Sequence, residues 1–134
     1  MINQKKVILI TEDELPMLNI LCNSLAESGY ETIQAKNGQE GLILAFQRHP
    51  DLILLDLLMP KMDGLTMMNR LRQDTWGKHV PVVFLTNVNP DADATLQEII
   101  KNQPSYYLVK ADSKLDEIVN KIKDVLSHPS PDSQ

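Results

Sequence analysis

Five short apolar runs alternate along the chain with longer stretches in which apolar residues recur every three or four positions. The runs are Lys5 to Ile10, Glu31 to Ala35, Leu52 to Leu55, Val82 to Leu85 and Tyr106 to Val109. Four of them are essentially continuous, which is typical of strands buried on both faces of a parallel sheet. The run at 31–35 alternates apolar and polar residues, so we expect that strand at an edge of the sheet.

The intervening stretches predict five helices, each with one apolar stripe. In the first, Pro16 suits the opening turn and the end falls near Ser28 and Gly29. The stripes expected to face inward are Leu18, Leu21, Cys22 and Leu25; Leu42, Ala45 and Phe46; Leu65, Met68 and Leu71; Leu96, Ile99 and Ile100, in a helix from about Asp91; and Leu115, Ile118, Val119, Ile122 and Leu126. Residues 128–134 have no large apolar side chain, so we expect one domain over residues 1–127 and a flexible tail over 128–134.

Strands that alternate with helices predict an α/β fold with a doubly wound parallel sheet. Right-handed crossovers place helices on both faces only if the strand order reverses once. The flavodoxin-like order 2-1-3-4-5 is one order with a single reversal, and it is the one we expect for the five strands here. Ligands of such sheets bind at the carboxyl ends of the strands beside the reversal.

Composition narrows the choice of partners. The 134 residues fit one domain, and the net charge of -5 argues against direct binding to nucleic acid or to an anionic membrane, because both favour a basic face. Proteins or a cation are the expected partners. The single cysteine, Cys22, excludes an internal disulfide and is expected to be buried. With no charged-then-apolar leader and no long apolar run, we expect a cytoplasmic protein.

Polar residues stand where four of the expected strands end. Glu12 and Asp13 follow the first strand, Asp56 the third, Thr86 the fourth and Lys110 the fifth. Singly, each has a plainer use, as a helix start, a cap or a solvated strand end. If strands one and three are neighbours, however, their three carboxylates converge and repel one another. A cation is then required, and oxygen ligands favour Mg²⁺.

A magnesium ion at this rim would allow Asp56 to meet an anionic substrate. The ion would screen the carboxylate from a phosphoryl donor, while Lys110 and the Thr86 hydroxyl would bind the phosphoryl oxygens. The residues therefore predict that Asp56 is a nucleophile that forms an aspartyl phosphate.

Residues 5 to 126 resemble the receiver domains of bacterial two-component response regulators. The matching positions are the acidic pair Glu12 and Asp13, the phosphoacceptor Asp56 with the following MPKMDG, the switch hydroxyl Thr86, the switch aromatic Tyr107 and the lysine Lys110. The resemblance implies that the backbone carbonyl of Leu58 also binds the metal. It implies a sensor histidine kinase or a phosphotransfer protein as donor, and a receiver that itself catalyses the transfer as a signalling protein rather than a metabolic enzyme.

The same resemblance implies a response to phosphorylation and a place for the kinase. Thr86 and Tyr107 are expected to move inward and to reshape a surface that a downstream protein reads. Ile20 lies roughly opposite the buried stripe of its helix, so we expect it to be exposed. Receiver domains dock the helices of the kinase at this helix, so the resemblance implies that Ile20 belongs to the docking surface.

The sequence departs from the receiver pattern beside the switch. Ala111 follows Lys110 where the family usually has a proline in a cis peptide, and Asn87 follows Thr86 where alanine, serine or glycine is usual. Residues 102–104 replace the Gly-Ala that is common before the fifth strand.

Two other functions compete with that of a receiver. The first is a dehalogenase-like phosphatase, which is disfavoured because it needs a second aspartate where this chain has Leu58. The second is a pseudo-receiver that only binds partners, and the presence of Asp13, Asp56, Thr86 and Lys110 together weakens that alternative.

Overall fold

The sheet has the expected order. The structure, a computed structural model, describes residues 5–57, 59, 61–87, 105–111 and 113–127. Its strands are β1 (Val7–Thr11), β2 (Glu31–Ala35), β3 (Leu52–Leu55), β4 (Val82–Thr86) and β5 (Ser105–Val109). They pair in parallel in the order β2-β1-β3-β4-β5, with β2 at an edge as its alternating pattern predicted.

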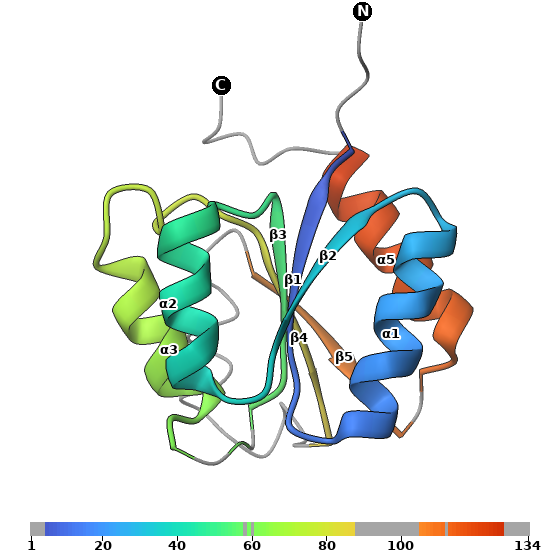
Figure 1. The fold of residues 1–134 in the computed structure, drawn as a ribbon, viewed down its shortest axis with the longest axis horizontal. Helices are drawn as coiled ribbons and strands as arrows, with labels where there is room; N and C mark the ends of the chain where they lie inside the picture. The colour runs from blue at the N-terminus through green and yellow to red at the C-terminus, as the bar shows by residue number, and fades with distance from the viewer. Residues whose placement is uncertain (1–4, 58, 60, 88–104, 112, 128–134) are drawn as a thin grey trace, which may run out of the picture.

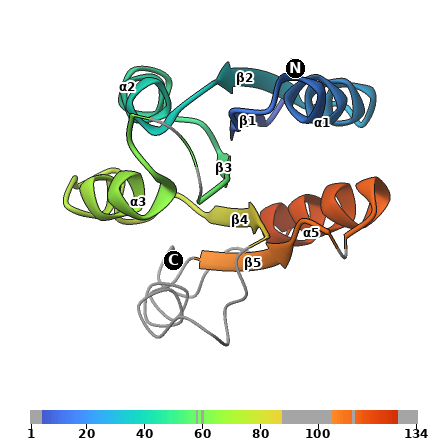
Figure 2. The same ribbon diagram turned by 90° about the horizontal axis from the view of Figure 1, so that it is seen from below.

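The described helices cover both faces of the sheet. They are α1 (Leu15–Glu27), α2 (Gly38–Arg48), α3 (Gly64–Arg72) and α5 (Leu115–Ser127). Helices α1 and α5 lie on one face and α2 and α3 on the other, as Figures 1 and 2 show. The helix expected from about Asp91 and the tail expected over residues 128–134 lie outside the described residues.

Each face of the sheet has its own apolar core because successive strand residues point to opposite sides. Along β1, Ile8 and Ile10 pack with α1 and α5, whereas Leu9 packs with α2 and α3. All three are fully buried, and so are Leu52 to Leu55 in β3. The continuous apolar runs of β1, β3 and β4 therefore correspond to strands covered on both faces, as predicted. The run in β5 differs, because this strand lies at the other edge of the sheet and Tyr106 to Val109 are only partly buried.

Two expected stripes differ in detail from the structure. Phe46 was predicted to face inward, but it is 38% exposed and meets Trp76 edge-on, with the ring centroids 6.5 Å apart. The buried positions of α2 are the small residues Gly38, Gly41 and Ala45, which let the helix lie close to the sheet, and Phe46 is turned away by about 100° from Ala45. In α5, Leu115 was also predicted to face inward but is 37% exposed, whereas Val125 is buried and Leu126 is partly buried against the same core.

The segment after β3 is held tightly against the end of that strand. The N–H of Gly64 donates to the carbonyl oxygen of Leu57 at 2.9 Å, and a Cβ at Gly64 would lie 2.5 Å from the carbonyl oxygen of Asp56. Asp63 caps α3 through its side chain, which accepts from the N–H of Thr66. Only glycine permits this approach, so Gly64 helps to position the residue at the strand end.

Candidate functional site

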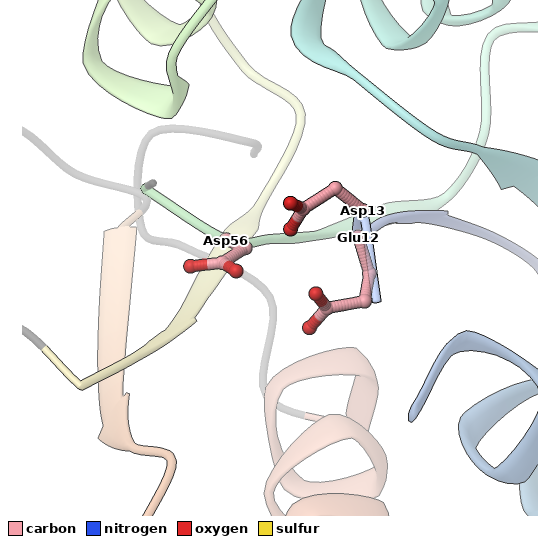
Figure 3. A group of neighbouring side chains, drawn as sticks. All are labelled: Glu12, Asp13 and Asp56. Carbon is pink, nitrogen blue, oxygen red and sulfur yellow. The ribbon is translucent and has the colours of Figure 1, made fainter. Parts of the chain in front are cut away.

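Three carboxylates meet where β1 and β3 end. The N–H of Asp56 donates to the carbonyl oxygen of Thr11 at 3.0 Å, which places Asp56 beside Glu12 and Asp13. One carboxylate oxygen from each of the three acids lies within 4.8 Å of the others. Figure 3 shows the three side chains directed toward a common space. Glu12 and Asp56 are 2% and 6% exposed, whereas Asp13 is open to solvent.

Lys110 supplies a cation among these acids. Its N–H donates to the carbonyl oxygen of Thr86 at 2.8 Å, so the residue is fixed just beyond the last pair of β4 and β5. Its Nζ lies 3.3 Å from Asp56 Oδ2, and 2.7 Å from each of Glu12 Oε1 and Glu14 Oε1. The Lys110 side chain is only 8% exposed.

The charges of the site shift several pKa values. Burial would lower the pKa of Lys110, but hydrogen bonds to Glu12 and Glu14 and the charge of Asp56 outweigh it, and the pKa is raised. Burial raises the pKa of Glu12, although Lys110 opposes the shift. The hydrogen bond to Lys110 lowers the pKa of Glu14. Lys110 is therefore held in its protonated form by its surroundings.

Glu12 uses both of its oxygens. Oε1 faces Lys110, and Oε2 accepts from the N–H of Glu14 at 3.1 Å. Glu14 is the residue that precedes α1, so this bond also ties the acidic loop to the start of the helix. Asp13, by contrast, is exposed to solvent.

A small cavity of about 180 Å³ opens beside Asp56. The described residues that line it are Asp13, Glu14, Asp56, Thr86, Asn87 and Lys110. The structure thus brings Thr86 and Lys110 to the cavity that contains Asp56, as their strand-end positions suggested. Glu14 and Asn87 were not predicted as site residues. Glu14 had a signal, because it is the third acid in a row after β1.

Two other residues that the resemblance implicates lie apart from this cavity or outside the described chain. Tyr107 belongs to β5, and its ring packs with the core on the side of α2 and α3. Its hydroxyl oxygen is buried. Leu58, expected to offer its carbonyl to a metal, is outside the described residues.

The donor set fits a hard divalent cation. Carboxylate oxygens are the ligands that Mg²⁺ prefers, and three are brought within reach of one ion. An ammonium group and a hydroxyl beside the Asp56 carboxylate suit an anionic group with several oxygens. None of the described helices combines the length and the hydropathy needed to cross a bilayer.

Comparison with known proteins agrees with this site. The response regulator receiver domain family model matches residues 8–123. The chain is 40% identical over 91 residues to the probable transcriptional regulator ycf27 of Porphyra purpurea, with 68% of this chain and 36% of that protein covered. It is 39% identical over 82 residues to the polar-differentiation response regulator DivK of Brucella ovis, with 61% and 66% covered. The chain thus spans about a third of the length of the ycf27-type relatives.

Solved structures give the same answer. The response regulator TrrA of Thermotoga maritima, determined in complex with Mg²⁺ and BeF, superimposes with a TM-score of 0.75 and 31% identity over 89% of this chain and 97% of that one. Because the family model spans most of the sequence and the strand order, the acidic group and the lysine are in place, the chain belongs to the response regulator receiver domains of two-component systems.

Proposed function

We propose that Asp56 accepts a phosphoryl group from a phosphohistidine of a sensor kinase or phosphotransfer protein, or from a small phosphodonor. The observation that supports this role best is the contact between Lys110 Nζ and Asp56 Oδ2 at 3.3 Å, at the end of β3 and within the acidic group. Asp56 is only 6% exposed, so little water reaches its carboxylate. The residue nevertheless lines the cavity, through which a phosphodonor can approach it.

The reaction needs little proton transfer. A carboxylate oxygen of Asp56 attacks phosphorus, an O–P bond forms, and the P–N bond to histidine or the P–O bond to acetate breaks with its electron pair leaving on the donor. Lys110 and the Thr86 hydroxyl are placed to bind the oxygens of the transferred group, because both line the cavity with Asp56. Positioning and charge stabilisation by these residues then carry the catalysis.

We assign the metal site to Glu12, Asp13 and Asp56, with the carbonyl of Leu58 as a further ligand. When bound, Mg²⁺ would neutralise the crowded carboxylates and the charge of the incoming group. The exposed carboxylate of Asp13 is the most accessible of the three. The two oxygens of Glu12 already accept bonds from Lys110 and from the N–H of Glu14, so Glu12 also serves to hold Lys110.

The output of the phosphorylated state is proposed to be a protein interface. Thr86 and Tyr107 are the switch residues in this proposal, and the surface they change binds a downstream protein rather than nucleic acid. We place this activity in a domain of residues 1–127 that acts in the cytoplasm. Relatives of the ycf27 type, described as probable transcriptional regulators, are about three times as long as the matched part.

Intact-mass measurement after incubation with acetyl phosphate and Mg²⁺ tests the proposal. The wild type is expected to gain one phosphoryl group, and Asp56→Asn none, because the amide is not a nucleophile here. Asp63→Asn is the matched control, since it removes a nearby carboxylate that caps α3 but keeps an oxygen for the cap. A wild type that gains no phosphate would favour a domain that only binds partners, and uptake by Asp56→Asn at the wild-type rate would contradict the assignment.

A further inference from the structure

The contact between strands β4 and β5 continues beyond the sheet through a side chain. The last backbone bond joins the N–H of Lys110 to the carbonyl oxygen of Thr86 at 2.8 Å. One residue further along each segment, Asn87 Oδ1 accepts from the N–H of Ala111 at 2.8 Å. The side chain of Asn87 thus takes the place of a backbone carbonyl and adds one more bond to the ladder.

This bond lies next to both residues proposed to bind the phosphoryl group. Asn87 follows Thr86 and lines the cavity, and Ala111 follows Lys110. The backbone of Lys110 is therefore held on both sides, by its own N–H and by that of Ala111. A lysine side chain has four rotatable bonds, and three carboxylates compete for its Nζ here. A fixed backbone restricts where that Nζ can reach.

We propose that Asn87 is a positioning residue that holds Lys110 in register with Asp56 through the N–H of Ala111, and this inference rests on the proposed function of Asp56. The two departures from the receiver pattern, Asn87 and Ala111, then act together as the acceptor and the donor of one hydrogen bond. Alanine at position 111 supplies an N–H that proline lacks, and asparagine at position 87 supplies an acceptor that alanine or glycine lacks. Each residue is of use only while the other is present.

A double-mutant cycle tests this dependence. Asn87→Ala and Ala111→Pro each remove the same hydrogen bond, so each is expected to slow phosphorylation by acetyl phosphate about three- to tenfold, or roughly 0.7 to 1.4 kcal/mol. The double variant is expected to be no slower than the slower single variant, because only one bond is lost. Ala111→Gly keeps the N–H and serves as the matched control, with a rate near that of the wild type.

A second measurement follows Lys110 itself and needs no phosphate transfer. Limited acetylation with an amine-reactive ester, read by peptide mass spectrometry, is expected to modify Lys110 about three- to tenfold faster in Asn87→Ala than in the wild type. The exposed Lys114 and Lys123 should react equally in both proteins. Hydrogen exchange at the Ala111 N–H should accelerate in the same variant. These two measurements decide the inference even if Ala111→Pro does not fold.

The outcomes separate this inference from the proposed function. A wild type that takes no phosphate contradicts the role of Asp56, while acetylation and exchange still report on Asn87. Unchanged acetylation of Lys110 in Asn87→Ala would overturn the positioning role. Losses in the two single variants that multiply in the double variant would also overturn it, because they would show independent effects.

Discussion

At the scale of single residues, Lys110 is the centre of the site, and its partners differ greatly in exposure. Glu12 is buried, with a side chain that is 2% exposed, whereas the side chain of Glu14 is 63% exposed. A buried partner cannot be replaced by water, but an exposed one exchanges with it readily. Glu14 is therefore a weak competitor for the ammonium group that the phosphoryl oxygens need.

This difference predicts the behaviour of Glu14→Gln. Removing the charge of Glu14 removes one of the ion pairs that Lys110 makes, so phosphorylation by acetyl phosphate is expected to accelerate roughly twofold. The melting temperature should stay close to that of the wild type, because this ion pair is exposed. The rate is measured by intact mass over time. Glu27→Gln removes another exposed acid, at the opposite end of α1 from the site, and should leave the rate unchanged. A slower Glu14→Gln protein would show that Glu14 helps the reaction.

At the scale of elements, the site depends on how closely loops approach strand ends. Gly64 begins α3 and would bring a Cβ to 2.8 Å from the Cα of Leu57 and 2.5 Å from the carbonyl oxygen of Asp56. Those atoms belong to the backbone, so they cannot turn away as a side chain can. A larger residue at position 64 must displace either α3 or the segment that carries Asp56.

Gly64→Ala is therefore expected to lower the free energy of unfolding by about 1 to 3 kcal/mol and to slow phosphorylation. Gly29→Ala is the control: its φ of 98° makes alanine unfavourable by about 1 to 2 kcal/mol, but no atom lies within 4 Å of the added Cβ and the residue is far from Asp56 in the chain. Chemical denaturation and phosphorylation rates are compared for the two. If both variants are phosphorylated at the same rate, Gly64 does not position Asp56.

At the scale of the whole molecule, each face of the sheet is covered by a helix with an exposed isoleucine, while the acidic residues of the site lie at one rim of the sheet. Ile20 on α1 is 49% exposed, as its place opposite the buried stripe predicted. Ile43 on α2 is exposed to a similar extent, at 51%, but lies on the other face of the sheet. These residues make a matched pair for testing which face a donor protein meets.

Ile20→Glu is expected to slow phosphoryl transfer from a partner kinase at least tenfold and to leave the rate with acetyl phosphate unchanged, since a charge in an apolar contact opposes docking only. Ile43→Glu should change neither rate. Both donors are compared in parallel by phosphoprotein gels. Equal slowing with kinase and acetyl phosphate in Ile20→Glu would exclude a docking role.

The metal acts on the stability of the whole domain. Because Mg²⁺ binds the folded site and not the unfolded chain, adding it is expected to raise the melting temperature, by the equivalent of about 2.7 kcal/mol at a hundredfold excess over the dissociation constant. Asp13→Ala should lose most of that rise. Thermal melts with and without Mg²⁺ measure it, with Ca²⁺-free buffer throughout. A wild-type melt that is independent of Mg²⁺ would contradict the metal site.

The sequence alone determined the layers, the strand order and the set of strand-end residues. Continuous apolar runs report burial on both faces, and parallel strands bring their carboxyl ends to one rim, so Glu12, Asp13, Asp56, Thr86 and Lys110 could be placed together without coordinates. The layers follow from local periodicity and from the handedness of crossovers, and the order 2-1-3-4-5 is one of the orders that reverse once. They do not require knowledge of any single side-chain contact.

Only the tertiary structure decided which groups actually meet. The engagement of Lys110 by Glu14, the bond from the N–H of Ala111 to Asn87 and the outward position of Phe46 depend on distances between segments far apart in the chain. Phe46 carries the same apolar signal as a core residue, and Asn87 the same polar signal as any loop residue. Periodicity assigns a side chain to a face, but the partner it finds is set by how closely two backbones approach, and that distance is a property of the packed molecule.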